Sequence, residues 1–254
     1  MTIQKTDKPK TTFSLVCTLL LVVSAVSTAH GFNREIPLKS NKRSPWVGKA
    51  LDGASCRGKP TNFGPYDYVL RRTYDYELFL VENAHFNSYV EQLIRGANTT
   101  NELGWDIDYT LRAFPNHHRA LYTVFRYRMR HGKYRHSVLA PPECYFQKAI
   151  YFSPEDGTTR MLYGILLHKL GKKNDALMQY RKAHQLQPHD AQTAYNLGLL
   201  LTELGHYDEA LEHAHRLYKN KFPLTGLKTK LQKKGAWKEI PTEPPENDKD
   251  TEDS

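Results

Sequence analysis

Apolar and small residues recur at a fixed interval in the second half of the chain. Six of them return 34 positions later: Gly164, Leu167, Leu170, Gly171, Ala176 and Leu177 reappear as Gly198, Leu201, Leu204, Gly205, Ala210 and Leu211. A period of this length predicts one helical hairpin per unit, with a glycine in the turn between its helices. Pro188 closes the first unit, and Asp190 is placed to cap a helix that begins near Ala191. The pattern therefore predicts two hairpins, at 157–190 and 191–224.

Weaker copies of the pattern precede these two units. Ala149 and Pro154 lie 34 positions before their equivalents in the next unit, which indicates the end of an earlier one. The start of that earlier unit is found at 119–122, with extra residues in its turn before Pro142. Further upstream, 81–96 has the apolar spacing of a helix. We therefore expect about four units, two of them degenerate, in a repeat domain at 81–235.

The pattern resembles the tetratricopeptide repeat family. The resemblance is carried by Gly164, Gly171, Ala176, Tyr180, Ala183 and Pro188 in one unit and by Gly198, Gly205 and Ala210 in the next. Arg160 and Ala194 depart from it, because the family often has Trp there. The resemblance implies an all-α solenoid of helical hairpins that binds a partner and does not catalyse a reaction. The chain also resembles a group of exported bacterial repeat proteins without a settled function, through segments such as 64–68, 106–121, 143–146 and 195–198.

The family resemblance also implies a binding groove along the first helices of the units. It selects these residues as facing the partner: Tyr127, Arg128, Met161, Ile165, His168, Lys169, Tyr195, Asn196 and Leu199. Apolar, aromatic and basic side chains in one groove favour a peptide or protein segment that carries negative charge. For each residue taken alone, ordinary packing is the competing interpretation.

The N-terminus carries the pattern of a secretory signal peptide. Lys5, Lys8 and Lys10 precede an apolar stretch at 13–29, and small residues end it. We expect removal of residues 1–29, with cleavage after Ala29 or Gly31. This predicts an exported protein in the periplasm of a Gram-negative bacterium. The alternative is a retained membrane anchor that faces the periplasm, because 17 mostly apolar residues approach the length of a membrane span.

Export changes the interpretation of the cysteines. Cys17 lies inside the apolar stretch, so Cys56 and Cys144 remain in the mature chain. Two cysteines in an oxidising compartment predict a disulfide bond, which would join the N-terminal part to the repeats. A nucleophilic or metal-bound thiol is the alternative. Neither cysteine has a neighbour at the spacing that those chemistries need.

Positive charge is concentrated in the middle of the chain. The formal net charge is +9, and no acidic residue occurs at 109–142. The basic patch predicted there comprises Arg119, Arg126, Arg130, Lys133 and Arg135, beside Arg112 and Arg128. Such a run is typical either of a solvated helix face or of a surface for an anionic partner. Because export argues against nucleic acid, we expect an acidic protein segment. The alternative is a peripheral contact with anionic lipid or with an anionic polymer of the cell envelope.

Catalytic and metal-binding patterns are weak. His213 and His215 are two residues apart, so on a helix they point in different directions and cannot share a metal. Asp106 and Asp108 are more readily explained as capping or surface residues than as an acid/base pair. We therefore expect no catalytic residue, no metal and no cofactor. The predicted function is a non-catalytic protein-interaction scaffold, with a membrane-associated adaptor and an enzyme of unrecognised type as alternatives.

The two flanking segments are expected to lack regular repeats. Residues 30–80 are rich in Gly, Pro, Ser and Lys, and we expect irregular structure there. Residues 236–254 are acidic and contain Pro, which predicts a disordered tail. Such a tail could compete with an acidic partner for a basic groove.

Overall fold

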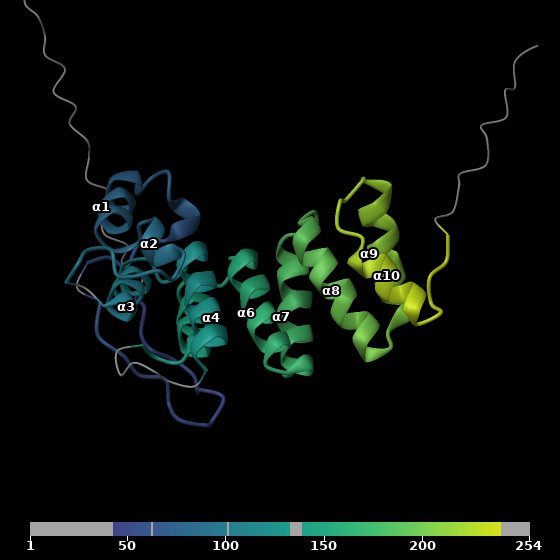
Figure 1. The fold of residues 1–254 in the computed structure, drawn as a ribbon, viewed down its shortest axis with the longest axis horizontal. Helices are drawn as coiled ribbons and strands as arrows, with labels where there is room; N and C mark the ends of the chain where they lie inside the picture. The colour runs from purple at the N-terminus through teal and green to yellow at the C-terminus, as the bar shows by residue number, and fades with distance from the viewer. Residues whose placement is uncertain (1–42, 62, 101, 133–138, 240–254) are drawn as a thin grey trace, which may run out of the picture. The chain divides into compact units, whose positions relative to one another are not determined.

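The computed structural model describes residues 43–61, 63–100, 102–132 and 139–239 (Figure 1). Within these ranges the chain forms helices and no strand, which confirms the predicted all-α solenoid. The elements are η1 Tyr68–Leu70, α1 Asp75–His85, α2 Ser88–Glu91, α3 Leu103–Ala113, α4 His118–His131, α5 Pro142–Phe152, α6 Gly157–Lys169, α7 Lys173–Leu186, α8 Ala191–Leu204, α9 Tyr207–Lys219 and α10 Gly226–Lys233. The expected signal peptide, Lys133, Arg135 and the tail beyond Glu239 lie outside the described residues.

Two hairpins, α6–α7 and α8–α9, lie where the 34-residue recurrence places them. The Asp190 carboxylate accepts a hydrogen bond of 2.7 Å from the Thr193 backbone N–H, so Asp190 caps α8 as predicted. Gly205 ends the same helix with φ of 83°, a conformation that favours glycine. Neighbouring helices of the array pack in sequence, and one apolar core extends from Phe86 to Leu231.

The recurring Gly164 has a packing role. A Cβ atom at this position would lie 2.6 Å from the buried ring of Tyr180, so α6 and α7 can approach only because the side chain is absent. The equivalent Gly198 has a different neighbour. Its added Cβ would meet Leu227 of α10 at 2.6 Å, because α10 closes the last hairpin. The recurring glycine thus allows close packing against α7 in one hairpin and against α10 in the next.

The first helix predicted in the array is interrupted. We expected one helix at 81–96. Instead, α1 ends at His85, and Asn87 caps a separate helix, α2. The Asn87 side chain accepts hydrogen bonds from the backbone N–H groups of Tyr89 and Val90, which favours a new helix start at this point. In addition, α1 begins at Asp75. The expectation of irregular structure at 30–80 was therefore wrong for residues 75–80.

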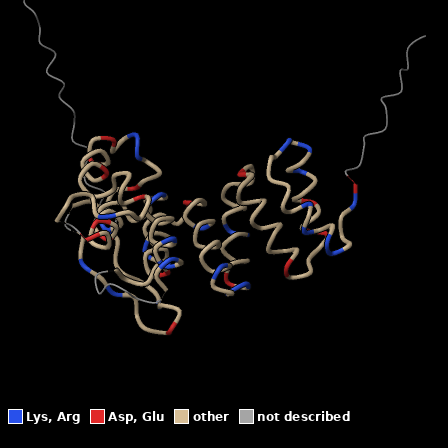
Figure 2. The backbone as a smooth tube through the Cα atoms, in the orientation of Figure 1, with Lys and Arg blue, Asp and Glu red and all other residues tan. Residues whose placement is uncertain are grey.

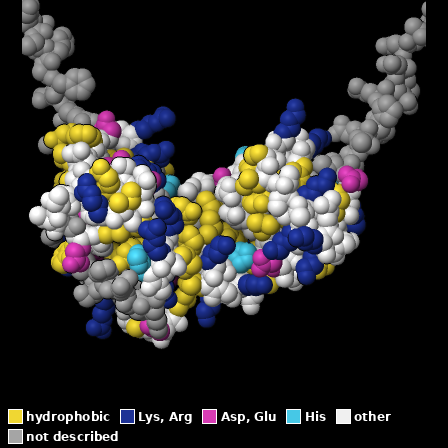
Figure 3. Space-filling model, viewed as in Figure 1, with side chains coloured by type: hydrophobic (Ala, Val, Ile, Leu, Met, Phe, Trp, Pro, Cys, Tyr) yellow, Lys and Arg dark blue, Asp and Glu magenta, His cyan; other side chains and the backbone are white. Residues whose placement is uncertain are grey.

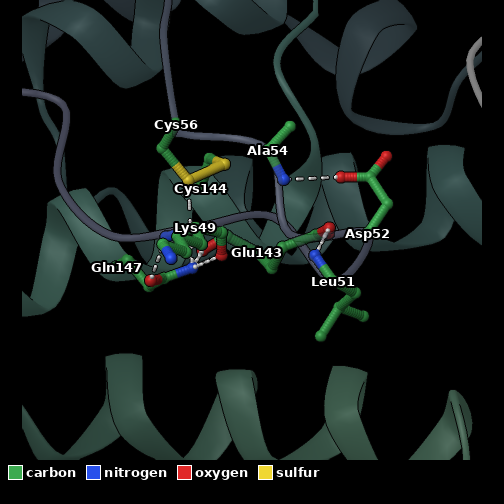
Figure 4. The surroundings of a disulfide bond; sticks show 8 residues. All are labelled: Lys49, Leu51, Asp52, Ala54, Cys56, Glu143, Cys144 and Gln147. Carbon is green, nitrogen blue, oxygen red and sulfur yellow. Dashed lines mark hydrogen bonds between the residues drawn. A yellow bond between two sulfur atoms is a disulfide. The ribbon is translucent and has the colours of Figure 1, made fainter.

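A disulfide bond between Cys56 and Cys144 joins the N-terminal segment to α5, as predicted (Figure 4). Hydrogen bonds hold the same contact. The Gln147 amide donates to the Lys49 carbonyl at 2.8 Å, and the Glu143 carboxylate accepts from the Leu51 N–H at 2.9 Å. The N-terminal segment is therefore fixed to the array by covalent and polar contacts together.

Buried polar groups hold the start of α6 against the turn between α3 and α4. The Asp156 carboxylate accepts hydrogen bonds from Asn116 at 2.9 Å and from the Thr159 backbone N–H at 3.1 Å, and its Oδ2 lies 2.8 Å from Nε2 of His118. Burial alone would raise the pKa of Asp156, but the contact with His118 and the other hydrogen bonds outweigh it and lower that pKa. Asn116 also donates to Asp67 at 2.8 Å, so the N-terminal segment joins the same network.

His213 of α9 lies in a polar contact with α7. Its ring centroid is 5.0 Å from that of His184, and Arg216 lies 3.1 Å from its Nδ1. Burial disfavours the charged imidazole, and His184 and Arg216 add to this effect, so the pKa of His213 is lowered to about 4. The opposing effect of Glu209 is smaller.

Within the described ranges, no helix combines the length and the apolar composition that a membrane span requires.

Removing the disulfide should destabilise the fold strongly. Replacing both cysteines with alanine should lower the free energy of unfolding by about 4 to 5 kcal/mol, because the 88-residue separation leaves a long loop unconstrained in the unfolded chain. Urea denaturation of the two proteins measures the difference. Reducing agent should affect only the wild type. A loss below about 1 kcal/mol would show that the bridge contributes little.

His213 should make stability depend on pH. The stability that neutral His213 contributes is fully present above the unfolded-state pKa of about 6.5 and is lost as pH falls through about 4. The free energy of unfolding should therefore fall by about 1 to 2 kcal/mol between about pH 7.5 and about pH 5. Denaturation of the wild type and His213→Gln measures this, with His189→Gln, at an exposed histidine, as the control. Equal pH slopes in the wild type and His213→Gln would contradict the assignment.

Candidate functional site

A cleft of about 510 Å³ opens between α6, α8 and α10. Apolar and aromatic side chains share its walls with charged ones, and the lining residues are Ile165, His168, Lys169, Lys173, Tyr180, Asn196, Leu199, Glu203 and Lys230. Figure 3 shows hydrophobic side chains at the surface of the middle helices, with histidine, acidic and basic side chains beside them. The cleft therefore offers both apolar contact and charge to a guest.

Glu203 is at the centre of the charged groups in the cleft. Its carboxylate lies 3.0 Å from His168, 3.0 Å from Lys173 and 2.6 Å from Lys230. Partial burial alone would raise the pKa of Glu203, but the hydrogen bonds from Lys230, His168 and Lys173 outweigh it and lower that pKa to about 2. Glu203 is therefore ionised at neutral pH.

Positive charge exceeds negative charge in this cleft. Three lysines and one glutamate line it, which gives a net charge of +2 with His168 neutral. Lys173 and Lys230 pair with Glu203, whereas Lys169 is exposed and forms no ion pair with any described residue. The cleft can thus accept at least one further carboxylate or other anion.

The cleft contains five of the nine residues that the family resemblance selected: Ile165, His168, Lys169, Asn196 and Leu199. Two of the nine, Met161 and Tyr127, are buried in the core. Met161 lies beneath the cleft, where Asn196 donates to its sulfur at 3.6 Å.

Two other selected residues lie outside the cleft. Tyr195 packs its ring 5.3 Å from that of Phe222, near the start of α10, and is covered on that side. Arg128 lies on α4 and is partly buried. Neither residue lines the same cleft as the five above.

Sequence reasoning missed four cleft residues: Lys173, Tyr180, Glu203 and Lys230. Glu203 could have been found, because it lies 34 positions after Lys169 and so occupies the same place in its helix. Lys230 could not, because it belongs to α10, which lies outside the repeat pattern and folds back over α8.

The predicted basic patch has acidic neighbours from another part of the chain. Lys and Arg gather along α4 in Figure 2. Arg119 pairs with Glu82 at 3.1 Å and with Glu91, and these hydrogen bonds and charges raise the pKa of Arg119. Arg126 and Arg130 donate to the backbone carbonyls at the end of α2 and just after it, at 3.1 and 3.0 Å. The run 109–142 has no acidic residue of its own, but Arg119 is paired, because its acidic partners precede the run in the sequence.

Asp106 and Asp108 are buried, contrary to the expectation of capping or surface roles. Asp106 lies 2.8 Å from Nδ1 of His85, and Asp108 accepts from Arg112 at 2.9 Å and from the Tyr145 hydroxyl at 2.7 Å. These contacts join α3 to its neighbours. Among the described residues, no group of three or more His, Cys, Asp and Glu side chains has an arrangement that could hold a metal ion.

Comparisons with known proteins give little beyond this geometry. No family model matches the sequence, and no curated protein matches it. Among solved structures, one match is the crystal structure of MamA, with 16% identity over 65% of this chain and 89% of that chain and a TM-score of 0.39. A similarity this low carries no functional inference. The assignment of an all-α helical solenoid therefore rests on the helices of the chain itself.

Proposed function

We propose that this protein is a non-catalytic scaffold that holds an acidic segment of another protein in the cleft between α6, α8 and α10. The observation that carries the proposal is the composition of the cleft: Lys169, Lys173 and Lys230 surround one glutamate, and Ile165 and Leu199 supply apolar wall. A site of this size holds a few side chains of a peptide rather than a whole domain. Catalysis and a cofactor form no part of the proposal.

The guest would use both kinds of contact. Its carboxylate would lie near Lys169, which has no ion-pair partner among the described residues. A second carboxylate could compete with Glu203 for Lys173 and Lys230. Apolar side chains of the guest would rest against Ile165 and Leu199, because alternate residues of an extended peptide point to one side.

We also propose that the protein works outside the cytoplasm, in a bacterial cell envelope. The disulfide between Cys56 and Cys144 supports this location, because such bonds persist in oxidising compartments. The apolar stretch at 13–29 with its preceding lysines supports export as well. Because export argues against nucleic acid as the anionic partner, we infer that the partner is a protein.

Charge reversal in the cleft should weaken the binding of acidic peptides. The probe is a fluorescein-labelled peptide of repeated Glu-Glu-Leu-Leu, which presents both Glu and Leu on each side of an extended chain. Lys169→Glu should lower its affinity by about tenfold, because attraction becomes repulsion at position 169. Glu203→Gln should raise affinity, because it frees Lys173 and Lys230 for the guest. Fluorescence anisotropy measures both changes.

The matched control is Lys182→Glu on α7, which changes the net charge equally but lies outside the cleft. A peptide of repeated Lys-Lys-Leu-Leu tests whether the probe binds through its negative charge. Circular dichroism of each variant shows that the helices remain. If Lys169→Glu and Lys182→Glu weaken binding equally, the cleft is not the site.

A further inference from the structure

Helix α1 carries large apolar side chains on both of its faces. On the inner face, Tyr74, just before the helix, and Val81 are buried in a small core with Phe114. On the opposite face, Tyr76, Phe79 and Leu80 are exposed by 53%, 61% and 40%. Their spacing of three and four residues places them in one row along the helix. A soluble helix normally presents polar residues on its outer face, so this outer row needs an explanation.

The row continues into the segment before α1. Hydrogen bonds from the Thr73 and Tyr74 N–H groups to the Leu70 carbonyl give 68–85 a nearly continuous helical path. Val69 and Leu70 are also half exposed, and Arg71 and Arg72 beside them are exposed. We call this set the α1 outer face: Val69, Leu70, Arg71, Arg72, Tyr76, Phe79 and Leu80.

The face combines apolar contact with net positive charge. Among its acidic neighbours, Glu77 is buried rather than exposed on this face, and Glu82 lies 2.9 Å from His117 and 3.1 Å from Arg119. Asp75 is the exposed acidic residue next to the two arginines. The described helix that packs against α1 is α3, on its inner side. Figure 3 shows hydrophobic side chains gathered at the surface over this end of the array.

A second copy of the chain fits this face poorly. A symmetric contact would place the same patch of two molecules together, so each copy would bring the summed charge of Arg71, Arg72 and Asp75 against the same positive charge. An anionic lipid surface instead satisfies both features. Aromatic and aliphatic side chains enter the boundary between head groups and acyl chains, and arginines bind the phosphates.

We propose that the α1 outer face binds the surface of an anionic lipid bilayer. The arginines of α4 are not the lipid contact, because Arg119, Arg126 and Arg130 are bound to Glu82, Glu91 and nearby carbonyls. The cleft between α6, α8 and α10 involves other residues, so the two proposals stand independently.

The test compares tryptophans at two positions with equal exposure in the full chain. Phe79 in the face and Met178 on α7 are both 61% exposed, so Phe79→Trp and Met178→Trp are matched reporters. Both variants keep the apolar stretch at 13–29, so any membrane attachment through it acts equally on both. The probes are vesicles of phosphatidylcholine alone or with phosphatidylglycerol, made with brominated acyl chains that quench nearby tryptophan.

Wild-type emission comes from Trp46, Trp105 and Trp237, so each reporter is read as its difference from the wild type under the same conditions. In anionic vesicles, the emission added by Trp at position 79 should shift to shorter wavelength and be quenched, whereas that added by Trp at position 178 should not. Adding Arg71→Glu and Arg72→Glu to Phe79→Trp should raise the lipid concentration for half-maximal quenching by about 30-fold, because each arginine contributes to head-group binding. Equal quenching of the two reporters would overturn the proposal, as would quenching unaffected by the arginine substitutions. An emission shift that follows protein concentration without vesicles would instead identify a second copy as the occupant.

Discussion

The buried carboxylate of Asp156 is the interaction on which the arrangement of the array depends. It caps α6, and in the same position it binds Asn116 and His118 from the turn between α3 and α4. Burying a carboxylate is costly unless hydrogen bonds satisfy its oxygens, and here several donors do so. Because these donors come from separate helices, the carboxylate fixes the orientation of the two hairpins that meet there. Asn116 also donates a hydrogen bond to Asp67. The same hydrogen-bond network therefore positions the N-terminal segment as well.

The last hairpin is completed differently, and this difference produces the cleft. At Gly198 the place of a following repeat helix is taken by α10, whose Leu227 and Leu231 enter the apolar core. α10 also carries Lys230 to the carboxylate of Glu203. A repeat in this position would bring its own groove residues, whereas the short α10 brings a lysine into the cleft. The positive charge of the site therefore depends on how the array ends.

Sequence periodicity was sufficient for the regular part of the fold. Gly164, Gly171 and Asp190 fixed the hairpins because each has a local steric or capping role that recurs with the unit. Contacts between distant segments have no such signal. The pairing of Arg119 with Glu82 and Glu91 crosses from one element to another, so a window of sequence around α4 could not contain it. The break before Asn87 was missed because the apolar spacing continues through it, whereas the Asn87 side chain caps a new helix.

Within the site, the repeat register located Ile165, His168 and Leu199, and the same register applied one unit further gives Glu203. Met161 and Tyr127, which the same register selects, are buried in the core.

The disulfide gives the first half of the chain the topology of a closed ring. The backbone from Cys56 to Cys144 runs through α1, α2, α3 and α4 before the bridge returns it to its starting point. A single break in the backbone anywhere within that ring would open it without releasing either piece. A nicked molecule would therefore keep its two fragments on one particle until a reductant separated them. While the bridge stays oxidised, it thus preserves the integrity of a cleaved molecule as well as the stability of an intact one.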